Sequence, residues 1–129
     1  KEFLTIFGND WPTIDGTVIR DYVHVMDIAE GHKAALDMLM LSEPTCLILN
    51  LGTGKGTSVL ELLEKFKFST GIEIEYKFGP RRMGDSAISL ANPKEALNYI
   101  NWKAKRTLND ICRDGWNWQT SNPKGYKDA

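Results

Sequence analysis

The sequence predicts an α/β fold, a small mixed domain in which strands and helices alternate along the chain. Residues 46–51 form a continuous apolar run, typical of a strand covered on both faces. Residues 72–78 alternate apolar and polar side chains, typical of a strand with one buried face, and helical periodicity occupies 28–41. At 129 residues the chain is long enough for one domain. We expect that domain at 1–122, followed by a tail at 123–129.

The first part of the chain predicts a strand, a loop and a second extended segment before the first helix. Residues 3–7 are rich in β-branched and aromatic side chains and predict a strand, whereas the Gly, Pro, Asn and Asp of 8–16 favour a loop. Residues 18–25 again favour extended structure with a short strand. Asp27 is the candidate N-cap of the helix that follows, and Pro44 is expected to end that helix.

The apolar run at 46–51 leads into a glycine-rich loop and a helix. Ser58 and Glu61 match a capping box, in which each side chain satisfies a free backbone N–H, and the helix is expected to reach Ser69 and to be closed by Gly71. Strand, glycine loop and helix together are similar to a phosphate cradle, but both the dinucleotide fingerprint and the P-loop pattern fail in detail. We expect the loop to turn the chain and to let one side chain approach a ligand.

Two more helices are predicted after the alternating strand and a basic loop at 81–85. A second capping box begins at Asn92 and opens a short helix to about Tyr99. Thr107 is expected to cap the last helix, which reaches about Trp118.

Several motifs have a plain structural interpretation. Tyr99 and Lys103 have the Tyr-x-x-x-Lys spacing of short-chain dehydrogenases, but the helix is expected to end near residue 101, which would separate the two side chains. His24 and His32 have no nearby cysteine, so structural histidines are favoured over a metal site.

Composition and charge exclude other classes of function. With 16 basic and 17 acidic residues the net charge is -1, which gives no footprint for nucleic acid or acidic lipid. No stretch approaches the roughly 18 apolar residues that cross a membrane, so a cytoplasmic protein is expected. Cys46 and Cys112 are expected to be buried free thiols. The chain opens on a strand without Met, which suggests a piece of a longer protein.

Charged side chains in loops are the best binding candidates. Arg20, Arg81, Arg82 and Asp85 each lie in or beside a predicted loop, and loops are where binding groups collect. Guanidinium groups match the two charges of a diphosphate, and a carboxylate accepts hydrogen bonds from a ribose diol. These residues therefore suit a nucleotide diphosphate, with ordinary surface charge as the simpler alternative.

Taken in order, these motifs resemble the UDP-glucose 4-epimerases of the extended short-chain dehydrogenase/reductase family. The similar blocks are 6–10, 15–17, 20–27, 50–59, 80–85, 102–103, 116–119 and 122–123. They cover nearly the whole chain but only the carboxyl-terminal part of the family's usual length. The resemblance implies the substrate-binding portion of a Rossmann-like enzyme, without its N-terminal NAD-binding domain.

The resemblance also implies roles for individual residues. Arg20 and Arg82 would clamp the UDP diphosphate, and Asp85 would accept hydrogen bonds from the ribose hydroxyls. The remaining expected contacts are Thr5 and Phe7 beside the uracil, Tyr22 and Val59 in the nucleotide pocket, and Ser89 near the sugar ring. The catalytic Tyr and Lys and the NAD site belong to the absent part, so we expect no catalytic residue, bound cofactor or metal in this chain alone.

The implied function is anchoring of UDP-glucose or UDP-galactose for NAD-dependent inversion at sugar C4, with the isolated chain inactive. Ser89 stands where relatives carry Tyr or Cys, and this suggests tolerance of UDP-N-acetylhexosamines. Two alternatives stay open: a non-catalytic UDP-sugar-binding module, and a sibling sugar-nucleotide epimerase, dehydratase or decarboxylase. Without its partner domain the chain should expose apolar surface and a strand edge, which favours self-association.

Overall fold

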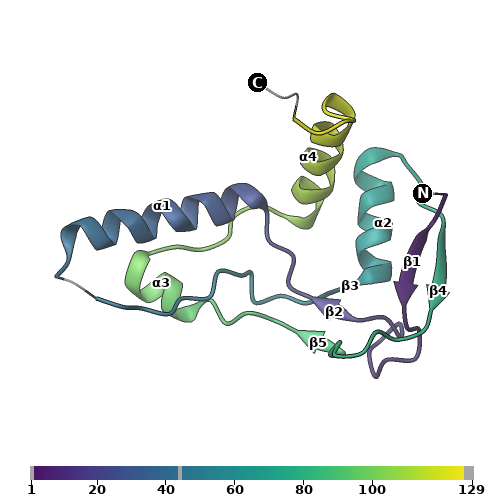
Figure 1. Ribbon diagram of the computed structural model, residues 1–129, viewed down its shortest axis with the longest axis horizontal. Coiled ribbons are helices and arrows are strands. Elements are labelled where there is room, and N and C mark those ends of the chain that lie inside the picture. The colour runs from purple at the N-terminus through teal and green to yellow at the C-terminus, as the bar shows by residue number, and fades with distance from the viewer. Residues whose placement is uncertain (1, 44, 127–129) are drawn as a thin grey trace.

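Two helical lobes are joined by short strands in the computed structural model, which describes residues 2–43 and 45–126 (Figure 1). In chain order the elements are β1 (Leu4–Phe7), β2 (Ile19–Arg20), α1 (Val25–Leu41), β3 (Thr57–Ser58), α2 (Val59–Thr70), β4 (Tyr76–Gly79), β5 (Ile88–Ser89), α3 (Lys94–Ile100) and α4 (Leu108–Ser121). The predicted mixed α/β class is confirmed. Part of the expected tail, 127–129, lies outside the described residues, as does Pro44.

The strands form two small sheets. β1 and β4 are parallel, with Leu4 opposite Tyr76 and Phe7 opposite Gly79. In the second sheet, β2 lies between β3, to which it is antiparallel, and β5, to which it is parallel. The loop from β4 to β5 therefore connects the two sheets.

One lobe is built by α1 packed against α3. Its buried centre contains Ala96, Ile100 and Trp102, and the indole Nε1 of Trp102 donates to the Asp27 carbonyl at 2.8 Å. Glycine at 31 permits this approach, because a Cβ there would lie 2.7 Å from Leu51 Cδ1 and 3.1 Å from Trp102 Nε1. The indole thus fixes the segment after α3 against α1.

The other lobe is built by α2 packed against α4. The rings of Phe66 and Trp116 meet edge to face, with centroids 5.8 Å apart. The predicted N-caps Ser58 and Thr107 are present, and Gly71 ends α2 in the left-handed region. At Ser58 only half of the predicted capping box is recorded, since Ser58 accepts from the Glu61 N–H without a return contact among the described residues.

The start of α1 differs from the prediction. Its N-cap is His24, whose Nδ1 accepts from the Met26 N–H at 3.0 Å. Asp27 lies in the first turn and is only 1% exposed, because Arg106 binds its carboxylate at 2.5 Å. The N-cap prediction for Asp27 was therefore wrong: a distant arginine uses the carboxylate that a local cap would have needed.

The predicted strand at 46–51 is also wrong. These residues are extended but pair with no strand of the described chain. Leu49 and Leu51 pack on the α1 and α3 core, whereas Ile48 is 89% exposed. A strand covered on both faces needs sheet neighbours, and residues 2–43 and 45–126 supply none here. Cys46 is consequently an exposed free thiol, contrary to expectation, while Cys112 is buried and free as expected.

Two smaller predictions are modified and a third is confirmed. The strand expected at 72–78 begins later and ends one residue later, as β4 at Tyr76–Gly79. The N-cap of α3 is Pro93 without a side-chain cap, since Asn92 Oδ1 accepts from the Lys94 N–H instead. The expected end of this helix is confirmed by Asn101, whose φ of 50° places it in the left-handed region.

Candidate functional site

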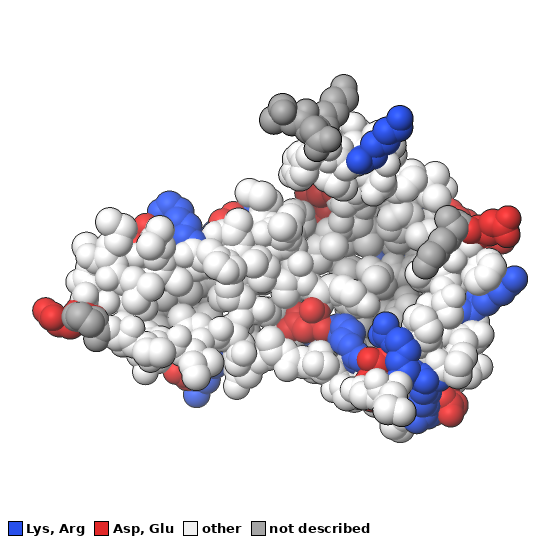
Figure 2. Space-filling model, in the orientation of Figure 1, with Lys and Arg blue, Asp and Glu red and all other residues white. Residues whose placement is uncertain are grey.

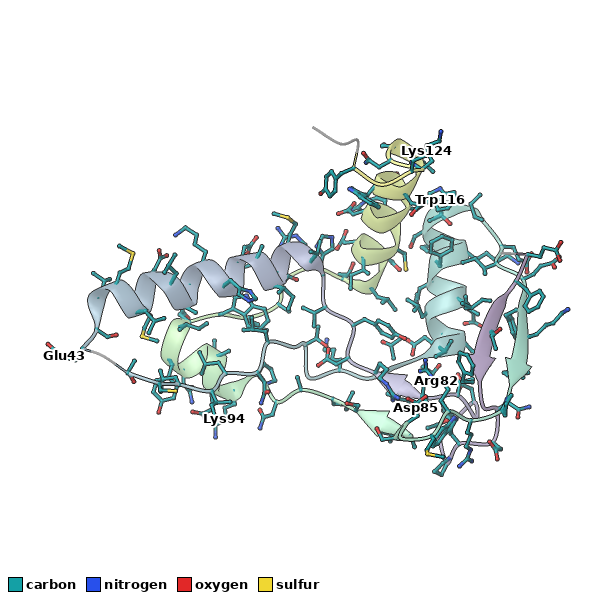
Figure 3. All side chains as sticks on the ribbon, viewed as in Figure 1. Glu43, Arg82, Asp85, Lys94, Trp116 and Lys124 are labelled. Atoms are coloured by element: carbon teal, nitrogen blue, oxygen red, sulfur yellow. The ribbon has the colours of Figure 1, made fainter. Side chains whose placement is uncertain are left out.

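Arg20 and Arg82 approach the same carboxylate from different elements. Arg20 ends β2, while Arg82 and Asp85 lie in the loop between β4 and β5. Arg82 Nε donates to Asp85 Oδ2 at 3.0 Å, and Arg20 Nη2 lies 4.0 Å from Asp85 Oδ1. Arg20 Nη1 also donates to the Ser86 carbonyl at 2.9 Å. Figure 3 shows Arg82 and Asp85 side by side next to β2. The structure thus brings together the three residues that the sequence singled out.

The cluster of Arg20, Arg82 and Asp85 carries a net positive charge and faces solvent. Its two guanidinium groups surround one carboxylate, and the Arg82 side chain is 58% exposed against 27% for Arg20. Among the described residues, Arg82 uses only Nε in hydrogen bonding, so its two terminal nitrogens are available to an anion. Figure 2 shows charged side chains gathered where β2, β5 and the β4–β5 loop meet, on a face that is otherwise mostly uncharged.

An aromatic ring adjoins this cluster. The Arg82 guanidinium carbon lies 4.6 Å from the centre of the Phe7 ring, at the end of β1. Thr5 lies two residues earlier on β1, on the same face of the strand as Phe7. A planar group bound here would have the Phe7 ring and a guanidinium plane beside it.

Ser89 and Val59 flank the cluster through the second sheet. Ser89 on β5 is the direct partner of Arg20 on β2 and is exposed. Val59 begins α2, and its N–H donates to Thr17 Oγ1 at 3.2 Å. Ser89 is therefore held by strand pairing with β2, and Val59 by the hydrogen bond of its N–H to the Thr17 hydroxyl.

Tyr22, another predicted site residue, borders a cleft between α3 and the glycine-rich loop. It lines a cleft of about 470 Å³ with Thr53, Leu97 and Trp102, and none of Arg20, Arg82 and Asp85 borders this cleft. Burial raises the pKa of Tyr22, and the nearby Arg20 charge opposes that rise only in part. Tyr22 therefore lies close to Arg20 of the charged cluster and also borders this cleft.

Sequence reasoning missed Asp21, which holds the glycine-rich loop. Its carboxylate accepts from the N–H groups of Thr53 at 3.0 Å and Gly54 at 2.9 Å. A Cβ at Gly52 would lie 2.3 Å from Ala91 Cβ and 2.7 Å from the Asp21 carboxylate, so the glycine is needed for packing. The amides that would cradle a phosphate are already occupied. The only sequence signal was an acid next to Arg20.

Asp15 was also missed, and it fixes the 8–17 loop to the start of α2. Its carboxylate accepts from the Thr17 N–H at 2.9 Å, from Thr17 Oγ1 at 2.8 Å and from Ser58 Oγ. Burial pushes the pKa of Asp15 upward, but the hydrogen bonds from Ser58 and Thr17 outweigh it and hold the pKa below its ordinary value. These contacts hold the loop that joins Phe7 on β1 to Arg20 on β2.

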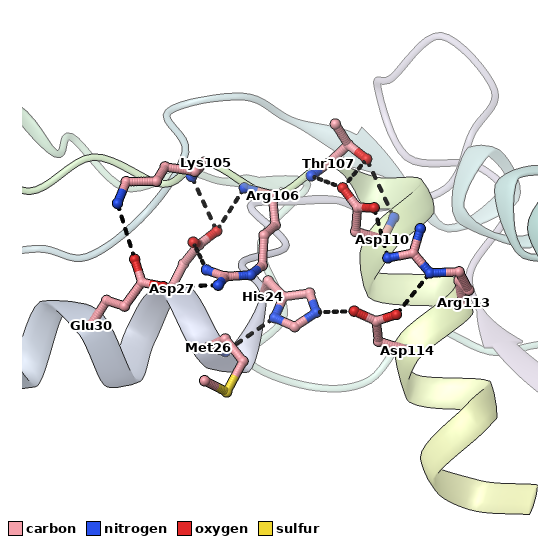
Figure 4. A network of polar contacts seen from close by, with 10 residues as sticks. All are labelled: His24, Met26, Asp27, Glu30, Lys105, Arg106, Thr107, Asp110, Arg113 and Asp114. Carbon is pink, nitrogen blue, oxygen red and sulfur yellow. Dashed lines mark hydrogen bonds and ion pairs between the residues drawn. The ribbon is translucent and has the colours of Figure 1, made fainter.

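A polar network connects the two lobes (Figure 4). The Nδ1 atom of buried His24 accepts from the Met26 N–H, so its Nε2 carries the proton and donates to Asp114 of α4 at 3.2 Å. Arg106 binds both Asp27 and Glu30 of α1. His24 is therefore structural, as expected.

The chain is similar to known proteins both in sequence and in structure. No family model matches the chain. The UDP-glucose 4-epimerase of Dictyostelium discoideum is 47% identical over 129 residues, and that of Bacillus subtilis (strain 168) is 49% identical over 128 residues. The solved UDP-glucose 4-epimerase of Bifidobacterium longum in complex with NAD+ and UDP has a TM-score of 0.91 at 40% identity. It covers 98% of this chain and 37% of that chain.

These matches define the class first: the chain has the fold of the carboxyl-terminal part of Rossmann-like, extended short-chain dehydrogenases. More narrowly, it is homologous over its whole length to UDP-glucose 4-epimerases, as the sequence motifs predicted. The chain spans only 38% of the length of the two curated relatives described above. Within 2–43 and 45–126, no helix is long and apolar enough to cross a membrane.

Proposed function

We propose that this chain anchors the UDP part of the substrate in an NAD-dependent UDP-hexose 4-epimerase. The observation that carries the proposal is the approach of Arg20 and Arg82 to the two oxygens of one carboxylate, that of Asp85. A diphosphate carries charge on both phosphoryl groups, and two guanidinium groups held a fixed distance apart can each take one of them. The UDP complex of the B. longum homologue supports the proposal.

In this proposal each part of the cluster has its own role. Arg20 and Arg82 hold the diphosphate, and Asp85 keeps the guanidinium groups oriented and accepts from ribose hydroxyls. Phe7 and Thr5 flank the uracil, Val59 borders the nucleotide pocket, and Ser89 lies near the sugar. Tyr22 also lines the nucleotide pocket in this proposal, near enough to Arg20 for that charge to oppose the rise that burial causes in its pKa.

Firm anchoring of UDP suits an epimerase, because the hexose must turn in the site while the nucleotide stays fixed. We assign the catalytic Tyr and Lys to a part of the full-length protein outside this chain. The described residues do not fit NAD, since the glycine-rich loop lacks the fingerprint and Asp21 occupies its amides. The chain alone should therefore bind UDP without turning over a UDP-sugar.

Calorimetric titration of the chain with UDP tests this proposal. Arg20→Ala and Arg82→Ala should each weaken binding about tenfold or more, because each removes charge-assisted hydrogen bonds. Lys33→Ala is the matched control, since Lys33 pairs only with exposed Asp37 on α1. Equal affinity in all four proteins would overturn the proposal.

Two finer proposals concern substrate choice. UDP-glucose and UDP-galactose are the proposed substrates of the full-length enzyme, since the curated relatives are UDP-glucose 4-epimerases. Ser89 is small and exposed beside Arg20, so an N-acetyl group on the sugar has room there. UDP-N-acetylhexosamines are therefore proposed as additional substrates.

A further inference from the structure

Arg81 and Arg82 are consecutive, but they contact different partners. Arg81 Nε donates to Asp10 Oδ1 at 2.7 Å, and its Nη2 donates to the Asp10 carbonyl at 2.5 Å. Its guanidinium carbon lies 4.1 Å from the centre of the Trp11 ring. Arg81 is thus bound by hydrogen bonds and by ring stacking to the loop between β1 and β2.

That loop also carries the ring under Arg82. The indole Nε1 of Trp11 donates to the Phe7 carbonyl at 3.1 Å, and the Phe7 ring lies beneath Arg82. A Cβ at position 8 would lie 2.5 Å from Trp11 Nε1 and 2.8 Å from Arg81 Cγ. Gly8, at a φ of 88°, is therefore required for the two arginine–aromatic pairs to form side by side.

The two arginines differ in what they can offer a ligand. Arg81 already gives two of its donors to Asp10, which also neutralises its charge, and the pKa of Asp10 is lowered by that hydrogen bond. Arg82 gives only Nε to Asp85 among the described residues. A bidentate contact with a phosphoryl group needs adjacent free N–H groups. Arg82 has more of these than Arg81.

We propose that Arg81 is a positioning residue for nucleotide binding. It clamps the β4–β5 loop onto the β1–β2 loop, so that Arg82 and Asp85 are held in the orientation that receives the diphosphate. The inference rests on the proposed function, because it assumes that Arg82 contacts the ligand. Without the clamp the β4–β5 loop can move. Arg82 must then be ordered when the nucleotide binds, which lowers the affinity.

A double-mutant cycle in UDP affinity tests this role. Arg81→Ala should raise the dissociation constant about tenfold when Arg82 is present and less than twofold in the Arg82→Ala background, because Arg81 acts through Arg82. A loss of equal size in both backgrounds, or no loss when Arg82 is present, would overturn the inference. If Arg82→Ala itself leaves affinity unchanged, the proposed function fails first and this inference fails with it.

Conservative variants separate positioning from general stability. Arg81→Lys keeps the charge but loses the planar fork, so its affinity should lie between those of wild type and Arg81→Ala. Asp10→Asn should weaken UDP binding in the same direction as Arg81→Ala. Circular dichroism and melting temperature should stay near wild type for both, and wild-type affinity in Asp10→Asn and Arg81→Lys alike would contradict the clamp.

Discussion

Ser89 is paired directly with Arg20 across the parallel strands β5 and β2. Side chains of directly paired residues project from the same face of a sheet, so the side chain at position 89 lies on the face from which Arg20 projects. In the proposed complex this is where the diphosphate ends and the sugar begins. The size of residue 89 should therefore decide which sugars fit.

Replacing Ser89 by tyrosine should separate two substrates in the full-length enzyme. Ser89→Tyr should reduce turnover of a UDP-N-acetylhexosamine about tenfold or more while UDP-galactose turnover is largely kept, because the ring fills the space of the acetyl group. Steady-state kinetics with both substrates measures this. Ser42→Tyr, at the exposed end of α1, is the control, and equal losses on both substrates would count against the idea.

Breaking the Asp27–Arg106 pair should strongly destabilise the fold. The Asp27 side chain is 1% exposed, and Arg106 also binds Glu30. Arg106→Met should lower the free energy of unfolding by about 3 kcal/mol, because it leaves a buried carboxylate without its partner charge. Urea denaturation checks this against Lys33→Met at an exposed pair, which should cost less than about 1 kcal/mol. Equal effects would show that burial of Asp27 is unimportant.

Asp110, in the capping box of α4, should make the stability of the fold depend on pH in acidic solution. Hydrogen bonds from Thr107 lower the pKa of Asp110 from 3.8 to about 2. A carboxylate whose pKa is lower in the folded state stabilises the fold above its unfolded pKa, and this contribution is lost as pH falls from 3.8 toward 2. Asp110→Asn should flatten the fall in melting temperature over that range, and an unchanged slope would argue against the cap.

Exposed apolar side chains of the α1–α3 lobe should drive self-association. Met40, Leu41 and Ile48 are 77%, 90% and 89% exposed. Surfaces of this kind associate in water when nothing covers them. Sedimentation velocity should show an increase in mass with concentration, and Leu41→Lys with Ile48→Lys should shift the chain toward monomer. A monomeric wild-type chain at high concentration would refute this prediction.

Local signals in the sequence were enough to place most elements. Ser58, Gly71 and Thr107 determine helix ends through contacts within a few residues, and all three were predicted correctly. Asp27 and the run at 46–51 were misjudged because their environment depends on distant or absent partners. Arg106 captures Asp27 from 79 residues away, and no described strand pairs with 46–51.

The candidate site was predicted to a similar extent. Arg20, Arg82 and Asp85 were identified from loop position and from the resemblance, and the structure brings them together. Asp21 and the clamp made by Arg81 were not foreseen, since Asp21 holds backbone amides that carry no residue-specific pattern and Arg81 pairs with Asp10, 71 residues away in the sequence.

A crystal structure of the chain soaked with UDP tests the central claim most directly. The account predicts diphosphate oxygens within hydrogen-bonding distance of both the Arg20 and the Arg82 guanidinium groups, with the ribose hydroxyls facing Asp85. UDP bound instead in the cleft that Tyr22 and Trp102 line, with both arginines unchanged, would contradict it.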